Sequence, residues 1–151
     1  MRIKGLLAVI ALLAAMSGIA MAQNPPPDRS IQYRQNVYGL VGWNFSALAD
    51  MLRGKRDFDG AEVKRRSERV VQLSQMLDEG FPEGSDTGAK TDALPAIWTN
   101  RADFDAKLAD FQREAAALAT VAAGGDEAAI KDQFGKTGAT CKACHDNYKA
   151  D

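Results

Sequence analysis

The residues with the clearest chemical potential form the run Cys141-Lys142-Ala143-Cys144-His145, which ends six residues before the C-terminus. This spacing is typical of covalent haem attachment, in which each thiol adds to one haem vinyl group and the adjacent histidine ligates the iron. The chain has two cysteines and one histidine, and all three lie in this run. The run therefore predicts one haem c per chain, bound covalently through Cys141 and Cys144, with His145 as an axial ligand.

Two other functions of a Cys-x-x-Cys pair conflict with the rest of the chain. A thioredoxin-like dithiol lies at a strand-to-helix turn near the start of a βαβ unit, whereas this pair ends a chain that lacks a strand pattern. A closed structural zinc site needs four ligands, and Cys141, Cys144 and His145 supply only three. The sequence therefore favours haem over a redox dithiol or a zinc site.

The first 22 residues have the pattern of a secretory signal peptide. Arg2 and Lys4 form a positive start, residues 6–15 are apolar but too short to span a bilayer, and residues 20–22 form an A-x-A cleavage site. We expect cleavage before Gln23, which leaves residues 23–151 as a single domain. A retained membrane anchor is the alternative. Because covalent haem is attached outside the bacterial cytoplasm, export predicts a periplasmic location.

The charge balance of the expected mature chain is mildly acidic. Without Arg2 and Lys4, 17 of the 19 basic residues remain against 20 acidic ones, which gives a net charge of about −3. The sequence has no basic patch with interleaved aromatic residues, and this argues against nucleic acid as a partner.

Apolar residues recur at helical spacing in four segments that follow the proline run at residues 25–27. Glycine, proline and charged residues separate the segments. The expected helices cover residues 28–52, 61–79, 102–123 and 127–149. No sustained strand alternation occurs, so the fold class predicted is all-α: an antiparallel up-and-down four-helix bundle with covalent haem c between its helices.

Local signals refine these helices. Asp59 and Glu62 resemble a capping box, and Asn100 and Asp126 are expected N-caps of the third and fourth helices. In the fourth helix both cysteines fall on the inward stripe, so the haem edge is expected to enter the bundle.

The export signal, the four helices and the C-terminal haem motif together resemble the class II c-type cytochromes, most closely the cytochrome c′ family. The resemblance covers essentially the whole mature chain. Its anchors are Tyr33-Arg34-Gln35, residues 95–98 (PAIW) and residues 138–146 (GATCKACHD). It implies a four-helix bundle that carries haem c.

The second axial position decides what the haem can do. In six-coordinate relatives the ligating methionine lies early on the first helix, one turn from the position of Arg34, where this chain has Tyr38. Met51 lies 13 residues further on, about 20 Å along a helix axis. We therefore expect five-coordinate, high-spin iron with an open distal face crowded by Tyr38 and Val41. Coordination by Tyr38 as tyrosinate is an alternative.

Polar residues are expected around the haem periphery. Arg34 is a charge on an apolar stripe, and a haem propionate is its natural partner, unless the side chain extends to solvent. Gln35 and Asp92 match family positions that approach the haem edge. Lys149 lies one turn after His145, where the family often has a basic residue that modulates the proximal side; a solvated lysine is the alternative.

A second apolar stripe on the first helix consists of Leu40, Trp43, Ala47 and Met51. Members of the family commonly dimerise through the first two helices, so we expect a homodimer. The alternative is that the second helix and its loop cover this stripe.

These features predict a cytochrome that binds NO or CO, transfers single electrons to an unidentified redox protein, or does both. The alternative is a six-coordinate, low-spin electron carrier of the c556 type. An enzyme is not expected, because a peroxidase needs a distal acid–base group and the chain has no second histidine.

Overall fold

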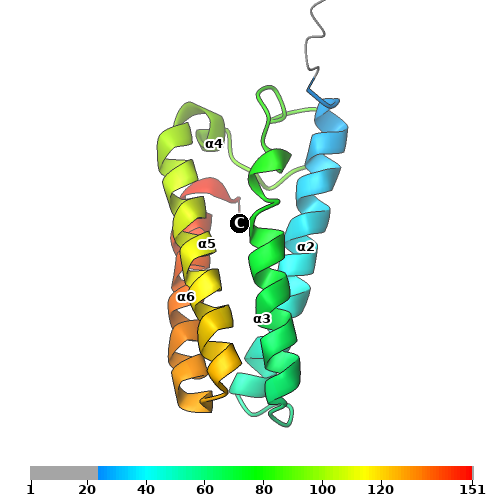
Figure 1. The fold of residues 1–151 in the computed structure, drawn as a ribbon. Coiled ribbons are helices and arrows are strands. Elements are labelled where there is room, and N and C mark those ends of the chain that lie inside the picture. Colours follow the sequence, from blue (N-terminus) through cyan, green and yellow to red (C-terminus); the bar gives the residue numbers. More distant parts are fainter. Residues whose placement is uncertain (1–23, 151) are drawn as a thin grey trace, which may run out of the picture.

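The computed structural model describes residues 24–150, in which the regular structure is helical apart from one antiparallel bridge between Ala93 and Lys149. The four long helices alternate in direction, so the predicted up-and-down four-helix bundle is confirmed (Figure 1). The helices are α2 (Pro27–Leu52), α3 (Gly60–Ser74), α4 (Ala96–Thr99), α5 (Arg101–Gly124) and α6 (Glu127–Tyr148), with the 3₁₀ turn η2 (Asp78–Gly80) after α3. The predicted signal peptide and its cleavage site before Gln23 lie outside the described residues.

Local sequence explains most helix ends. α2 begins at Pro27, whose missing N–H costs nothing in a first turn. The side chain of Asp59 accepts from the Glu62 N–H, as the capping motif predicts, and Asp126 accepts from the amides of Ala128 and Ala129. Gly125 ends α5 with a left-handed φ of 77°, a conformation that glycine adopts without strain.

Two predicted helix details are wrong. The second helix ends at Ser74 rather than at residue 79, because the chain tightens into η2 where Gly80 packs directly on α2. Asn100 occupies the N-cap position of α5, but its side chain does not cap that helix. The Asn100 amide donates instead to the hydroxyl of Tyr148, 3.2 Å away.

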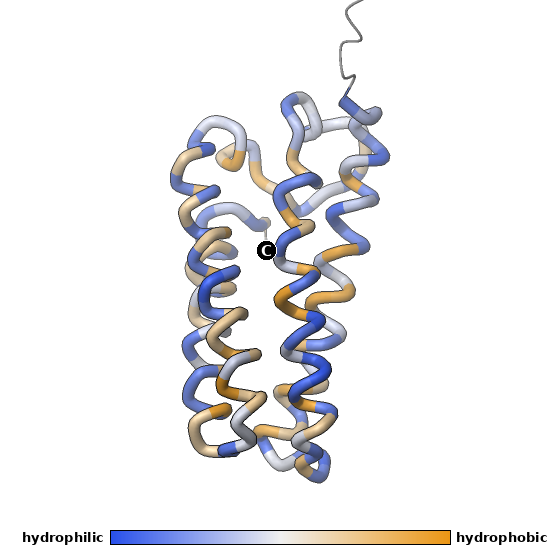
Figure 2. The backbone as a smooth tube through the Cα atoms, in the orientation of Figure 1, coloured by the Kyte–Doolittle hydropathy of each residue, from blue (hydrophilic) through white to orange (hydrophobic). Residues whose placement is uncertain are grey.

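The buried side chains form two clusters along the bundle. The lower cluster lies near the α2–α3 and α5–α6 connections and contains Leu48, Met51, Leu52, Val63, Leu118, Ala122, Ile130 and Phe134. The upper cluster contains Val37, Val41, Val70, Leu77, Phe81, Ile97, Phe104, Leu108, Phe111, Ala115 and Tyr148. Hydrophobic and hydrophilic stretches alternate along each long helix, which allows one face to pack inward (Figure 2).

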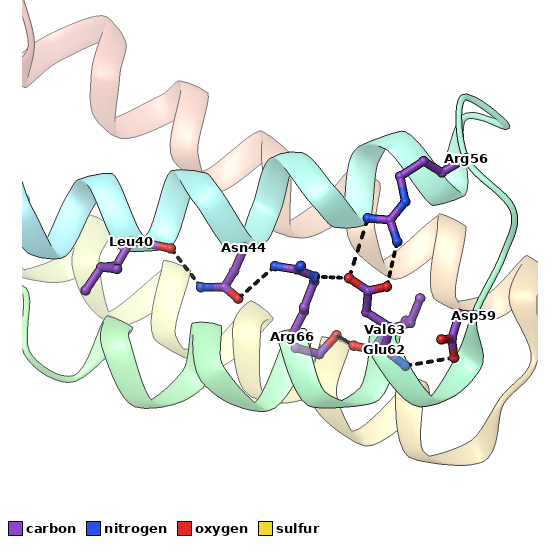
Figure 3. Close-up of polar contacts among 8 residues, drawn as sticks. Leu40, Asn44, Arg56, Asp59, Glu62, Val63 and Arg66 are labelled. Carbon is purple, nitrogen blue, oxygen red and sulfur yellow. Dashed lines mark hydrogen bonds and ion pairs between the residues drawn. The ribbon is translucent and has the colours of Figure 1, made fainter.

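A polar network joins α2 to α3 beside the lower cluster (Figure 3). Glu62 accepts from Arg56 at 2.6 Å and from Arg66 at 2.7 Å, and Arg66 also donates to Asn44 at 3.3 Å. Asn44 is buried, and its amide donates to the carbonyl of Leu40. The network satisfies the buried amide and fixes the α2–α3 pair.

The described helices have no segment that meets the length and apolarity of a membrane span.

Candidate haem site

Cys141, Cys144 and His145 lie on the last two turns of α6. Both thiols are partly buried and pack against the upper cluster, and neither forms a disulfide. The Sγ of Cys141 lies 3.6 Å from the carbonyl of Thr137, one turn earlier. Burial raises the pKa of both thiols, which is the behaviour of cysteines held on a hydrophobic face.

A cavity of about 250 Å³ opens beside Cys144 and His145. Its wall combines α2, α4, α5 and α6 with the segment between α3 and α4. The residues that line it are Arg34, Gln35, Tyr38, Phe81, Thr91, Asp92, Ala93, Ile97, Phe104, Cys144, His145, Tyr148 and Lys149. The structure therefore brings residues from distant parts of the sequence together into one site, which has aromatic walls, a thiol, an imidazole and a charged rim.

Tyr38 lines this cavity, as expected for a distal residue. Its ring meets Phe81 edge-on, with ring centroids 6.2 Å apart. Burial, followed by the nearby thiols of Cys144 and Cys141, raises the pKa of Tyr38 well above its usual range. Val41, the other expected distal residue, is buried in the upper cluster and does not belong to the described cavity wall.

Arg34 is 2% exposed, so the alternative in which it extends to solvent is wrong. Its guanidinium donates to the carbonyls of Gly80 (3.1 Å) and Ser85 (2.9 Å) and to the hydroxyl of Thr91 (2.9 Å). It also stacks over the rings of Phe81 and Trp98, 5.1 and 5.5 Å from their centroids. Arg34 thus anchors the α3–α4 connection to α2 while it faces the cavity.

The buried Nε of Arg34 has no hydrogen-bond partner within residues 24–150. Desolvation lowers the pKa of this guanidinium, although nearby Tyr38 and Asp86 oppose that effect. A buried cation with an unused donor favours an anionic partner, because an unpaired buried donor is costly.

Gln35, Asp92 and Lys149 lie together at the rim of the cavity. The Gln35 amide donates to the carbonyl of Lys90 at 2.9 Å. The Lys149 ammonium lies 3.9 Å from the Asp92 carboxylate. The sequence predicted a role for each of these residues but not their contact. Both side chains of this pair are exposed, so its energy is small.

Tyr148 has no role assigned from the sequence, and the structure places it in the cavity wall. It is 4% exposed, and its hydroxyl donates to the Asp103 carboxylate at 2.5 Å. Burial and this hydrogen bond raise the pKa of Tyr148 to about 12. Its carbonyl accepts from the amide of Leu94 at 3.0 Å, which ties the end of α6 to the segment before α4.

Sequence reasoning also missed Phe81, Thr91 and Phe104 in the cavity wall. Phe104 belongs to an inward stripe at helical spacing, and this signal indicates a core residue without distinguishing a cavity wall. Phe81 and Thr91 lie in the α3–α4 connection, where helical spacing carries no information about packing.

The residues present fit a covalently bound haem. The cavity has aromatic walls for a flat apolar ring, and Cys144 and His145 lie on its α6 side with Cys141 one turn earlier. The unpaired buried Nε of Arg34 offers a donor for a carboxylate such as a propionate. Two thiols that can form thioether bonds and an imidazole that can ligate the iron are the groups that covalent haem attachment requires.

The family model described as cytochrome C′ matches residues 29–149, which include every residue of the cavity wall. This chain belongs to the cytochrome c′ family. Members of the family bind covalent haem c, and the two cysteines of the motif are present here, so the cofactor predicted from the sequence is confirmed.

Among curated relatives, cytochrome c′ from Rhodopseudomonas palustris is 37% identical over 144 residues, covering 94% of this chain and 93% of the relative. Cytochrome c′ from Rubrivivax gelatinosus is 36% identical over 123 residues, covering 82% and 95%. Since the matches span nearly the full length of these relatives, the resemblance extends to the whole domain.

Solved structures agree. Cytochrome c prime from Shewanella frigidimarina is 46% identical, with a TM-score of 0.82 over 85% of this chain and 100% of that chain. A nitric oxide complex of a leucine-to-alanine mutant of cytochrome c prime from Alcaligenes xylosoxidans is 32% identical, with a TM-score of 0.79 over 85% and 100%. The bundle and its connections are therefore those of cytochrome c′ structures.

Proposed function

We propose that this chain is a periplasmic cytochrome with five-coordinate, high-spin haem that binds NO or CO and transfers single electrons without catalysing a reaction. Cys141 and Cys144 would hold the ring through thioether bonds, and His145 would ligate the iron. The haem iron supplies the ligand-binding and redox chemistry of such a site.

The cavity wall carries this proposal. Its described residues include Tyr38 but no methionine, and a low-spin carrier needs a second strong ligand, usually methionine or histidine. Met51 is buried in the lower cluster, and Met76 lies at the surface with 38% exposure. Neither thioether of the expected mature chain is placed to serve the cavity, which supports an open coordination position.

Tyr38 is better suited to crowd that position than to ligate the iron. Its raised pKa keeps the hydroxyl protonated at neutral pH, because the buried site disfavours the tyrosinate anion. A neutral aromatic wall beside the iron favours small uncharged ligands over anions.

The rim residues have roles that follow from their charge. The Arg34 guanidinium, with its free Nε, would bind a propionate, and Gln35 lies beside it on α2. Lys149 would place a cation near His145, where it stabilises the reduced over the oxidised site, and Asp92 partly offsets that charge.

Two further features support the ligand and the location. A neighbour in structure is a nitric oxide complex of a cytochrome c prime, which supports NO as a ligand of this chain. The positive start, apolar stretch and A-x-A site of residues 1–22 support export to the periplasm.

We also propose a homodimer through α2 and α3. Leu40 and Trp43 on α2 are 51% and 72% exposed, which agrees with the predicted outer stripe. The inclusion of Met51 in that stripe was wrong, because Met51 is 2% exposed and packs in the lower cluster. A tryptophan and a leucine exposed one turn apart favour a protein partner.

Titration of the ferrous protein with CO and NO tests the function. We expect both gases to change the absorption spectrum, and Met51→Leu to leave the spectrum of the gas-free protein unchanged. A low-spin spectrum that becomes high-spin in Met51→Leu would instead establish the six-coordinate alternative. Tyr38→Phe, which keeps the ring and removes the hydroxyl, should preserve the high-spin spectrum if Tyr38 is not a ligand.

A further inference from the structure

Metal-binding histidines often donate their second ring N–H to a protein carboxylate or carbonyl, which fixes the ring. Within residues 24–150 no protein group forms a hydrogen bond with the His145 ring, and the side chain is exposed. The position of the imidazole therefore depends on the helical turn that carries it.

That turn is the last one of α6, where helices ordinarily fray. Tyr148 follows His145 by three residues and therefore lies on the same face of the helix, one turn later. Its hydroxyl donates to Asp103 at 2.5 Å and accepts from the amide of Asn100 at 3.2 Å. Its ring packs edge-on against Phe104, with centroids 5.4 Å apart.

The backbone around Tyr148 is fixed on the opposite side. The Tyr148 carbonyl accepts from the Leu94 amide at 3.0 Å, and the Ala150 amide donates to the Asp92 carbonyl at 2.7 Å. Ala93 and Lys149 form the antiparallel bridge between these bonds. The final turn of α6 is thus held by α5 through a side chain and by residues 92–94 through the backbone.

We propose that Tyr148 is a positioning residue for His145: its hydroxyl tie to Asp103 and Asn100 holds the imidazole in place from one turn away. The inference rests on the proposed function in one respect, namely that His145 is the axial ligand. Tyr148 touches the cavity, but its tie acts on His145 through the helix and not on the iron.

The test compares Tyr148→Phe with the matched variant Tyr33→Phe in the haem-loaded, full-length mature protein. Each change removes one tyrosine hydroxyl, and the Tyr33 hydroxyl binds the Met76 carbonyl and Glu79 away from the cavity wall. Because a hydrogen bond to a charged group changes an equilibrium by about tenfold or more, Tyr148→Phe should speed amide exchange at Leu94 and Ala150 about tenfold.

The decisive readout is the iron–histidine stretching band in the resonance Raman spectrum of the ferrous protein, together with the reduction potential. We expect Tyr148→Phe to broaden and shift this band and to shift the potential, while Tyr33→Phe leaves both unchanged. Faster exchange with an unaltered band and potential would mean that Tyr148 only stabilises the fold, and would overturn the inference. Unaltered exchange would overturn it as well.

Asp103→Asn supplies a second variant if Tyr148→Phe loses its haem. It keeps the tyrosine and weakens the charged hydrogen bond, but it also removes the ion pair of Asp103 with Lys107, so Lys107→Gln is the control that removes the ion pair alone. Relative to that control, Asp103→Asn should move band, potential and exchange in the same direction as Tyr148→Phe by a smaller amount, and an unchanged potential would again overturn the inference. The iron–histidine band of the unmodified protein tests the proposed function independently of Tyr148. If that protein shows no such band, the five-coordinate site is wrong, and the potentials of the variants decide the role of Tyr148.

Discussion

At the scale of single residues, the site depends on the buried guanidinium of Arg34 and on the aromatic rings that it contacts. Arg34 is buried without an acidic side chain paired to it in the described residues, and it donates to four backbone or hydroxyl oxygens of the α3–α4 connection. The same guanidinium lies between Phe81 and Trp98. One side chain therefore fixes a cavity wall and presents a positive charge to it.

Removal of this guanidinium should be costly. Arg34→Gln would leave the buried carbonyls of Gly80 and Ser85 without their donor, so we expect a loss of about 2–4 kcal/mol in the free energy of unfolding. Chemical denaturation of the haem-loaded protein measures this loss. Arg113→Gln is the control: Arg113 is exposed and paired only at the surface, so its removal should change stability by at most about 0.5 kcal/mol. Equal losses in the two variants would contradict the anchoring role of Arg34.

The residues of the haem motif were predictable because their chemistry depends on local spacing. Cys141, Cys144 and His145 lie within five consecutive residues, and the chain has no other cysteine or histidine that competes for their role. The partners of Tyr148 were not predictable, because Asp103 and Asn100 lie 45 and 48 positions away and meet it only after the bundle forms. Asp92 and Lys149 are also distant in the sequence, and their pairing was not predictable for the same reason.

At the scale of elements, helical spacing predicted the long helices to within a few residues at most ends. The exception is the end of α3, where the apolar stripe continues past Ser74 but the backbone tightens into η2. The cause is a close approach: a Cβ on Gly80 would lie 2.5 Å from the Cβ of Arg34 and 3.1 Å from its Cα. A single sequence does not reveal such a contact between distant segments.

Gly80→Ala tests this contact. The added methyl group must displace η2 or α2, so we expect a loss of about 1–3 kcal/mol in stability and a disturbed Arg34 anchor. Gly135→Ala is the matched change in an open position on α6, where nothing lies within 4 Å, and it should stabilise the helix by about 0.5–1 kcal/mol. Thermal unfolding of both variants measures the difference. A neutral Gly80→Ala would show that the 3₁₀ turn has another origin.

The α2–α3 pair should carry a pH dependence that originates at Glu62. Hydrogen bonds from Arg56, then Arg66, lower the pKa of Glu62 from 4.5 to about 2. A depressed pKa in the folded state stabilises the fold above the unfolded pKa, and this stabilisation is lost as the pH falls from 4.5 toward 2.

Denaturation midpoints measured across that pH range test this origin. The unmodified protein should lose more stability on acidification than Glu62→Gln, which cannot titrate there. Glu127→Gln removes a carboxylate in the first turn of α6 and serves as the control, with a pH profile close to that of the unmodified protein. Identical profiles for all three proteins would exclude the Glu62 network as the source.

At the scale of the whole molecule, the bundle divides into a filled lower half and an upper half built around a cavity. The sequence predicted the bundle because four amphipathic segments have few other ways to bury their apolar faces. The sequence did not show that the two halves differ. It also did not place Met51 on the correct face of α2, because the helical spacing of this residue fits both the inner and the outer apolar stripe. The three-dimensional packing alone assigns Met51 to the core and leaves Leu40 and Trp43 exposed.

The exposed pair Leu40 and Trp43 predicts self-association. Trp43→Glu should convert a homodimer into a monomer, because a charge in an apolar interface is left unpaired. Sedimentation velocity at micromolar concentration measures the change, with Lys131→Glu on exposed α6 as a charge-changing control that stays dimeric. A monomer for the unmodified protein would rule out the dimer.

The proposed site is a covalently attached haem whose iron has His145 on one side and no protein ligand on the other. The absorption spectrum of the purified mature protein, recorded oxidised and then reduced, tests it most directly. We expect high-spin spectra in both states from a pigment that stays with the chain after acid–acetone extraction. A low-spin spectrum in the reduced state, or a pigment that the solvent removes, would contradict it.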